Sequence, residues 1–171
     1  MELTKKERTI KYVVYAVIIA VLSLLQNVGG LWFEIGGARC FFLVPAAVLL
    51  SLEEDEKTAA LIGLFAGLLW DITAAHHMGF NCLFIMVSCY IMSVLVTHLF
   101  RATFWVGTVG AVLFTFLYVL IYWLVFVLIK GGDGSGVTFF TFYLPSFFYT
   151  AVMTVVMNIA FVPLKRKLNK A

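Results

Sequence analysis

The stretch that decides the fold is residues 60–81, ALIGLFAGLLWDITAAHHMGFN, an apolar run that contains small and charged residues. Within it Gly63, Gly67 and Asp71 recur at every fourth position, so on an α-helix they lie along one face. Small residues on one face let two helix backbones approach closely, which favours helix association in lipid. The stretch therefore predicts a membrane helix whose glycine face contacts protein rather than lipid.

The composition of the whole chain is that of a membrane protein. Of 171 residues, 63% are hydrophobic and 12% are charged, with a mean hydropathy of +1.05, whereas a soluble domain is about half apolar and about a quarter charged. The net charge of +3 is too small to indicate a nucleic-acid partner. Cys40, Cys82 and Cys89 have no metal-ligand spacing and predict no disulfide framework.

Hydrophobic runs separated by charged or glycine-rich segments predict an all-α bundle of about six transmembrane helices. The second run is shorter than the ~20 residues that a spanning helix needs, and Pro45 interrupts its hydrogen bonding unless it lies in the first turn. That segment could be tilted, short or partly re-entrant. The runs are residues 12–28, 41–52, 58–75, 80–100, 103–129 and 138–164.

Clusters of basic residues flank the first and last runs. Such residues favour the cytoplasmic side, so we expect both termini in the cytoplasm and an even number of crossings, which requires the second run to cross. The expected organisation is a basic cytoplasmic N-terminus (residues 1–11), one membrane-embedded domain (12–164) and a basic cytoplasmic tail (165–171). The expected topology determinants are Lys5, Lys6, Arg8, Lys11, Lys165, Arg166 and Lys167.

Asp71 is the polar residue that most needs an explanation, because a charged side chain near the centre of a bilayer costs about 2.5–3.5 kcal/mol. Counted from Lys57 at the inner boundary, Asp71 lies about 20 Å along the helix, in the outer half of the membrane. We hypothesise an ion pair with Arg39, which has the opposite charge at a matching depth. The alternatives are that Asp71 caps a helix end or reaches interfacial water.

The other polar residues do not form the constellation of an enzyme or a metal site. His76 and His77 are adjacent, so their side chains point about 100° apart on a helix, and no third metal donor accompanies them. No nucleophile, base and orienting acid fall at matching depth. We therefore expect no catalytic, cofactor-binding or metal-binding residues. Two polar stripes, Thr115 with Tyr118 and Tyr122, and Thr154 with Asn158, are expected to hydrogen-bond between helices.

The spacing of Gly63, Gly67, Asp71 and Gly79 resembles the signature of the rod-shape-determining protein MreD family. The chain length, the basic tail and the Leu25 and Gln26 ending of the first run are also similar to that family, whereas residues 74–77 are bulkier than the small polar turn expected there.

The resemblance implies a non-enzymatic subunit of the bacterial cell-elongation machinery in the inner membrane. Such a subunit maintains rod cell shape and links peptidoglycan synthesis to the MreB cytoskeleton. The implied partners are MreC and further elongation-complex proteins, namely MreB, RodA and a transpeptidase, besides the lipid bilayer. Gly63, Gly67, Asp71 and Gly79 would form the helix-packing or partner face.

Two other classes of protein stay open. The substrate-binding component of an energy-coupling-factor vitamin transporter also has about six helices and a small-residue motif in its first helix, where this chain has Ala16 and Ala20. A vitamin pocket needs several convergent polar groups on the outer side, and these are sparse in the sequence. An intramembrane enzyme acting on lipid would lose turnover, but not folding, when Asp71 or His77 is replaced.

Overall fold

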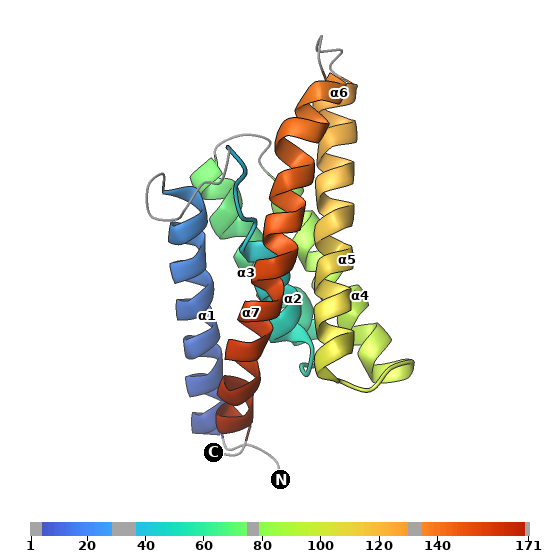
Figure 1. Cartoon of the computed structure of the whole chain (residues 1–171). Coiled ribbons are helices and arrows are strands. Elements are labelled where there is room, and N and C mark those ends of the chain that lie inside the picture. The colour runs from blue at the N-terminus through green and yellow to red at the C-terminus, as the bar shows by residue number, and fades with distance from the viewer. Residues whose placement is uncertain (1–4, 29–36, 75–78, 130–134, 170–171) are drawn as a thin grey trace.

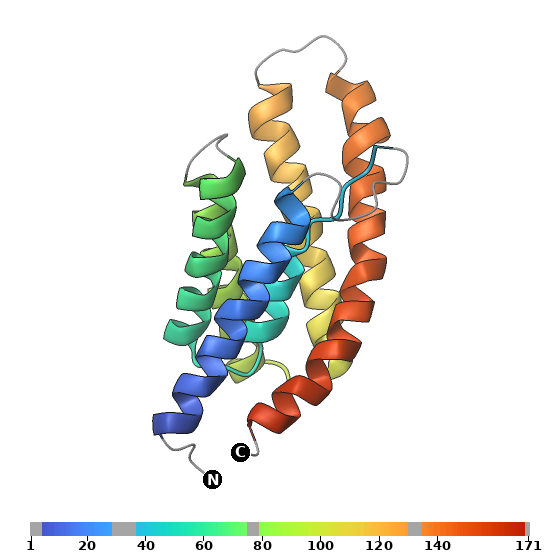
Figure 2. The same cartoon turned by 90° about the vertical axis from the view of Figure 1, so that its left-hand side faces the viewer.

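The chain folds into a bundle of helices in the computed structural model, which describes residues 5–28, 37–74, 79–129 and 135–169. α5 and η1 form one rod, and α6, η2 and α7 form another (Figure 1). Both ends of the chain lie at the same end of the bundle (Figures 1 and 2). The predicted all-α, polytopic fold class is confirmed. The elements are α1 (Lys5–Asn27), α2 (Leu43–Ser51), α3 (Glu56–Ala74), α4 (Phe80–His98), α5 (Phe104–Tyr122), η1 (Trp123–Leu128), α6 (Ser135–Thr138), η2 (Phe139–Tyr143) and α7 (Leu144–Leu168).

Four helical stretches in the described residues are long and apolar enough to cross a membrane: Lys5–Asn27, Phe80–His98, Phe104–Leu128 and Gly136–Leu168. They correspond to the first, fourth, fifth and sixth predicted runs. α3 has a similar length, with 19 residues, but it carries charged residues near both ends. It packs along α4 over most of its length.

α2 is too short to cross a membrane by itself, because its nine residues rise only about 13 Å. The chain reaches α2 through a non-helical segment, residues 37–42, which begins toward the end of the bundle opposite the termini (Figure 2). The second predicted run, 41–52, is therefore helical only from Leu43 to Ser51. Pro45 lies in the first turn of α2, where its missing N–H would have no partner within the helix.

The backbone of the non-helical segment is hydrogen-bonded by side chains of α7. The Arg39 N–H donates to Ser146 Oγ at 3.0 Å, and the Phe41 N–H donates to Thr150 Oγ1 at 3.0 Å. Non-helical backbone is tolerated at membrane depth only where protein buries it and satisfies its polar groups. These two bonds explain how the chain enters the bundle without a full-length helix.

α2 forms the centre of the bundle. All of its residues are buried, and α1, α3, α4, α5 and α7 contact it. A helix that is apolar on all sides suits such a buried position. Gln26 on α1 accepts a hydrogen bond from the Leu43 N–H at 2.9 Å, so α1 supplies the cap that α2 lacks in its own sequence.

The two basic flanks are helical in the described residues. α1 begins at Lys5 and α7 continues to Leu168, so both helices extend past the predicted membrane boundaries at residues 11 and 165. Because both flanks lie at one end of the bundle, they share one side of any membrane that the bundle crosses. The assignment of that side to the cytoplasm, and the division of the chain into two tails and a membrane domain, stay predictions.

Candidate functional site

The glycine stripe of α3 packs against α4 of the same chain. A Cβ atom placed on Gly63 would lie 2.6 Å from the Ile85 carbonyl oxygen, and one placed on Gly67 would overlap the backbone of Cys82. Only glycine allows this approach, because real side-chain carbons do not come so close to backbone atoms. The stripe predicted from the sequence as a packing or partner face is thus occupied by the chain's own next helix.

Asp71 lies where this contact reaches the start of α4, and its carboxylate caps that helix. Its side chain is buried, with 5% of the residue exposed. Oδ2 accepts hydrogen bonds from the backbone N–H groups of Gly79 at 2.9 Å and Cys82 at 3.0 Å. The first N–H groups of a helix lack partners within the helix, and its N-terminus favours a negative charge. A carboxylate on α3 therefore stabilises the start of α4, where Gly79 has a positive φ of 96°.

A hydrogen-bonded chain leads from Asp71 across α4 to α5. The Asn81 amide donates from Nδ2 to Asp71 Oδ1 at 2.9 Å, and the Tyr118 hydroxyl donates to Asn81 Oδ1 at 2.7 Å. All three residues are at most 5% exposed. Three successive helices, α3, α4 and α5, are thus joined by one buried network, in which both carboxylate oxygens of Asp71 are satisfied.

The predicted ion pair between Asp71 and Arg39 is not among the contacts of the described residues. The donors to the Asp71 carboxylate there are Gly79, Asn81 and Cys82. The Arg39 side chain is exposed. The alternative that Asp71 caps a helix end is closer to what is seen, but the capped end belongs to α4 and not to Asp71's own helix.

The predicted interhelical stripes are partly used between helices. Asn158 on α7 donates to Thr108 Oγ1 on α5 at 2.7 Å and to the Phe104 carbonyl at 3.0 Å. Thr115 and Thr154 instead donate to carbonyl groups of their own helices, at 2.8 Å and 2.7 Å. Threonine hydroxyls satisfied by the preceding turn need no partner on a neighbouring helix.

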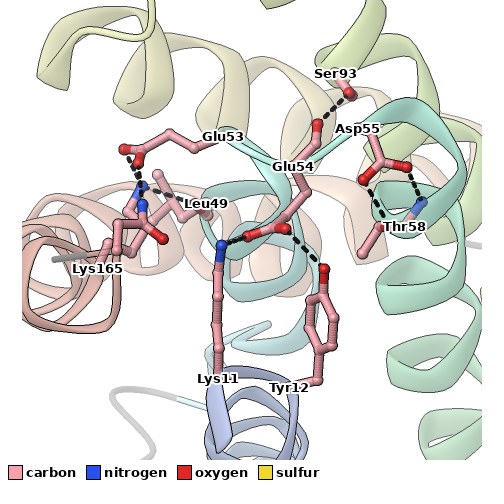
Figure 3. Close-up of polar contacts among 10 residues, drawn as sticks. Lys11, Tyr12, Leu49, Glu53, Glu54, Asp55, Thr58, Ser93 and Lys165 are labelled. Carbon is pink, nitrogen blue, oxygen red and sulfur yellow. Dashed lines mark hydrogen bonds and ion pairs between the residues drawn. The ribbon is translucent and has the colours of Figure 1, made fainter. Parts of the chain in front are cut away.

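A second polar cluster lies near the end of the bundle that holds both termini (Figure 3). Lys11 on α1 forms a buried ion pair with Glu54 in the turn between α2 and α3. The Tyr12 hydroxyl donates to the same carboxylate at 3.3 Å, and Ser93 on α4 donates to the Glu54 carbonyl at 2.8 Å. The turn between α2 and α3 thus contacts α1 through the Glu54 carboxylate and α4 through the Glu54 backbone carbonyl.

Lys165 on α7 completes this cluster. It is 3% exposed, donates to the Leu49 carbonyl at the end of α2 at 3.1 Å, and lies 3.4 Å from Glu53. Lys11 and Lys165 were singled out in the sequence only as topology determinants, but their side chains are buried and paired. By contrast, the other five predicted determinants are exposed: Lys5, Lys6, Arg8, Arg166 and Lys167.

The remaining candidate residues are the histidines and the potential metal ligands. No group of three or more His, Cys, Asp or Glu side chains is placed to hold a metal ion among the described residues. His98 pairs with Glu56 at 3.4 Å on an exposed surface. His76 and His77 lie outside the described residues.

Comparison with known protein families matches residues 7–169 to rod shape-determining protein MreD. Searches of curated proteins and of solved structures each found no match. The family match covers nearly the whole chain, including both polar clusters and all of the described helices apart from the first two residues of α1. The chain therefore belongs to the rod shape-determining protein MreD family.

Proposed function

We propose that the chain is a non-enzymatic subunit of the cell-elongation machinery in the bacterial inner membrane. In this proposal it assembles with MreC and helps to link peptidoglycan synthesis to the MreB cytoskeleton, with RodA and a transpeptidase as further members of the assembly. Membership of the family supports a role in rod-shape determination. The proposed subunit is embedded in the lipid bilayer, and the proposal includes neither a cofactor nor a nucleic acid.

The observation that supports the proposal is that the buried polar groups form hydrogen bonds and ion pairs with one another. Asp71, Asn81 and Tyr118 hydrogen-bond to one another across three helices, and Lys11 is paired with Glu54. Groups engaged in this way hold helices in position, because breaking such a network leaves buried polar atoms without partners. A rigid bundle that contributes helix surfaces to other membrane proteins fits a subunit of an assembly better than an enzyme.

Co-purification tests the proposed assembly. A tagged form of the chain, extracted from rod-shaped cells in a mild detergent, is expected to retain MreC through affinity and size-exclusion steps. A polytopic membrane protein of similar size with the same tag is the control and should retain none. Recovery of the folded chain without MreC, from cells that contain MreC, would contradict the proposal.

Complementation separates a subunit that acts through contacts from an intramembrane enzyme. Cells that depend on Asp71→Ala, Tyr118→Phe or the exposed control Tyr90→Phe would be scored for rod shape and for the amount of folded protein. We expect shape to follow the amount of folded protein in all three. Loss of rod shape in a Tyr118→Phe strain with normal folded protein and normal MreC binding would favour chemistry at this site.

The transporter alternative gives a different result in the same preparations. A vitamin-binding component gains thermal stability when its vitamin is added, because a ligand that binds only the folded state shifts the unfolding equilibrium. Such stabilisation in a preparation from which MreC is consistently absent would favour the alternative. The family match supports a role in rod-shape determination and so favours the first proposal over the transporter.

A further inference from the structure

A groove of about 380 Å³ lies between α4 and α5. It is lined by hydrophobic side chains and one glycine, which come from the second half of α4, the first half of α5 and Phe100 in the turn between them. This turn lies toward the end of the bundle that holds both termini (Figure 1). From Trp105 to Leu113 the groove follows α5, a distance of about 12 Å at the standard helical rise.

Met92 forms the floor of the groove, and Gly110 makes room for it. A Cβ atom on Gly110 would lie 2.5 Å from Met92 Cε and 2.7 Å from its Sδ, so the methionine side chain lies directly against the α5 backbone. Met92 is 3% exposed, whereas Trp105 and Val109, which also line the groove, are 73% and 62% exposed. The groove is therefore closed toward the core and open toward the surroundings of the bundle, which in a membrane are lipid.

The size of the groove suits an extended hydrocarbon chain better than a helix. A helix with its side chains is about 10–12 Å across, so that two turns of helix occupy roughly 1,000 Å³. That is well above the volume of the groove. An extended acyl chain is much thinner and can lie along the 92–113 contact between the two helices. The apolar lining therefore fits one acyl chain of a lipid.

Arg101 places a positive charge at the mouth of the groove. It lies in the turn between Phe100 and Trp105, both of which line the groove, and its side chain is exposed. Among the described residues the guanidinium has no hydrogen bond or ion pair. A guanidinium suits the geometry of a phosphate group, and tryptophan is enriched at the membrane–water interface. The mouth of the groove thus has the residues that bind a phospholipid headgroup.

The acidic turn between α2 and α3, residues 53–56, does not use this cation. It lines a separate cavity, which shares no lining residue with the groove. Two of its carboxylates have lysine partners, and Asp55 accepts hydrogen bonds from Thr58 at the start of α3. The fourth, Glu56, lies 3.4 Å from His98. Each carboxylate of the turn is therefore engaged elsewhere, and Arg101 is available to an anion from outside the chain.

We propose that an anionic phospholipid binds at this place, with one acyl chain in the groove between α4 and α5 and its phosphate beside Arg101. The chain packs on Met92 and Val109, where it gains dispersion contacts with a surface that it follows closely. The charge supplies the selectivity. Phosphatidylglycerol carries a net negative charge, whereas phosphatidylcholine carries none, so the first is attracted to the cation more strongly.

Quenching of tryptophan fluorescence by brominated lipids tests the proposal, because bromine quenches only on close approach and Trp105 lines the groove. The full chain is placed in vesicles of phosphatidylcholine that contain a minor fraction of phosphatidylglycerol. Bromine is carried on the acyl chains of the phosphatidylglycerol in one preparation, and on an equal amount of the phosphatidylcholine in the other. The difference between the unaltered chain and Trp105→Phe isolates the signal of Trp105.

We expect the Trp105 signal to report a preference of about fivefold for phosphatidylglycerol, the ratio that one basic side chain near an anionic headgroup supplies. Arg101→Gln should abolish the preference, and Arg101→Lys should keep most of it. Arg166→Gln removes an exposed arginine of α7 outside the groove lining and should leave the preference unchanged.

A second pair of variants tests the groove itself. Val109→Phe places a ring in the groove and should lower the preference for phosphatidylglycerol measured at Trp105. Val152→Phe makes the same change on α7, outside the groove lining, at a residue that is 65% exposed, and should have no effect. Each variant is first compared with the unaltered chain by size exclusion. If Val109→Phe misfolds, Leu113→Phe replaces it, since Leu113 is another exposed residue of the lining.

Three results would overturn the proposal. The first is equal quenching by the two brominated lipids in the folded chain, which would leave the groove to bulk lipid or to a partner helix. The second is equal loss of the preference in Arg101→Gln and Arg166→Gln, which would mean that the lipid responds to overall charge. The third is an unchanged preference when the groove is filled, which would separate the headgroup site from the groove.

Discussion

The side chain of Asp71, on α3, caps the N-terminus of the next helix, α4: Oδ2 accepts a hydrogen bond from the backbone N–H of Gly79 at 2.9 Å. The same oxygen accepts from Cys82 one turn later, and the glycine stripe below it brings the two helix backbones together. The α3–α4 pair is therefore held by a charged cap at one end and by close backbone packing along its length.

Replacement of Asp71 by alanine is expected to destabilise the chain by about 3 kcal/mol or more. The change removes a charge and leaves two buried donors, on Asn81 and Cys82, and the half-buried Gly79 N–H unsatisfied, and each buried donor left so costs about 1–3 kcal/mol. Arg101→Asp, at an exposed side chain, should change stability by only about 0.5 kcal/mol. The measurement is thermal unfolding in detergent.

The double charge reversal, Asp71→Arg with Arg39→Asp, distinguishes the cap from the ion pair hypothesised from sequence. A cap made of backbone N–H groups cannot use an arginine, so the double variant should be no more stable than Asp71→Arg alone. Substantial rescue would show that the pair contributes after all.

Gly67→Ala is expected to destabilise the α3–α4 contact by about 1–3 kcal/mol, because the added carbon overlaps the Cys82 backbone and the helices must move apart. Gly136→Ala is the matched control, since a Cβ atom there meets nothing within 4 Å. Comparison of the two Tm values by the same unfolding assay removes the general effect of helix propensity, which favours alanine at both sites. Equal Tm changes would contradict the packing explanation.

Lys11→Met is expected to cost about 3–5 kcal/mol, because it leaves the buried Glu54 carboxylate without its cation. The double variant Lys11→Met with Glu54→Gln should recover much of the loss, since it removes both charges. Lys6→Met, at an exposed lysine of the same helix, should change stability by about 0.5 kcal/mol or less. A role for Lys11 in topology alone predicts no recovery in the double variant, which a double-mutant cycle of unfolding free energies measures.

The sequence was sufficient for the fold class, and it indicated one face of α3 for close packing, because both inferences depend on local patterns. Hydrophobic run length identifies membrane helices, and the fourfold spacing of Gly63, Gly67 and Asp71 identifies one face of a helix. The spacing does not show which helix packs against this face. The same pattern would be present whether α4 or another protein packed on it.

The partners of the charged residues could not be predicted in the same way. Opposite charge and similar depth suggested Arg39 for Asp71, but the donors are two backbone N–H groups and an amide. Backbone donors are present at every non-proline residue, so they leave no signal in the sequence. The sequence indicated Lys11 only as a topology determinant, because its burial depends on how α1 packs against the α2–α3 turn.

The sequence indicated the non-helical segment before α2, residues 37–42, only indirectly. An even number of crossings required residues 41–52 to traverse the bundle, although the run was too short to do so as a helix. The side chains that make this possible, Ser146 and Thr150, lie about a hundred positions later on α7. Their spacing of four places both on one helix face, but the sequence does not show that this face meets an unpaired backbone.

The double variant Ser146→Ala with Thr150→Val tests whether these hydroxyls hold the irregular segment. Removal of both acceptors leaves the Arg39 and Phe41 N–H groups unsatisfied in a low-dielectric setting, so we expect a loss of about 2–4 kcal/mol in unfolding free energy from two such groups. The control is Thr141→Val, which removes an exposed hydroxyl bonded only within its own helix turn. Amide hydrogen exchange gives a second, local measurement: exchange at residues 39–41 should become faster in the double variant and not in the control. If exchange there is unchanged while global stability falls, the two hydroxyls act through the packing of α7 instead, because the segment would have kept its hydrogen bonds.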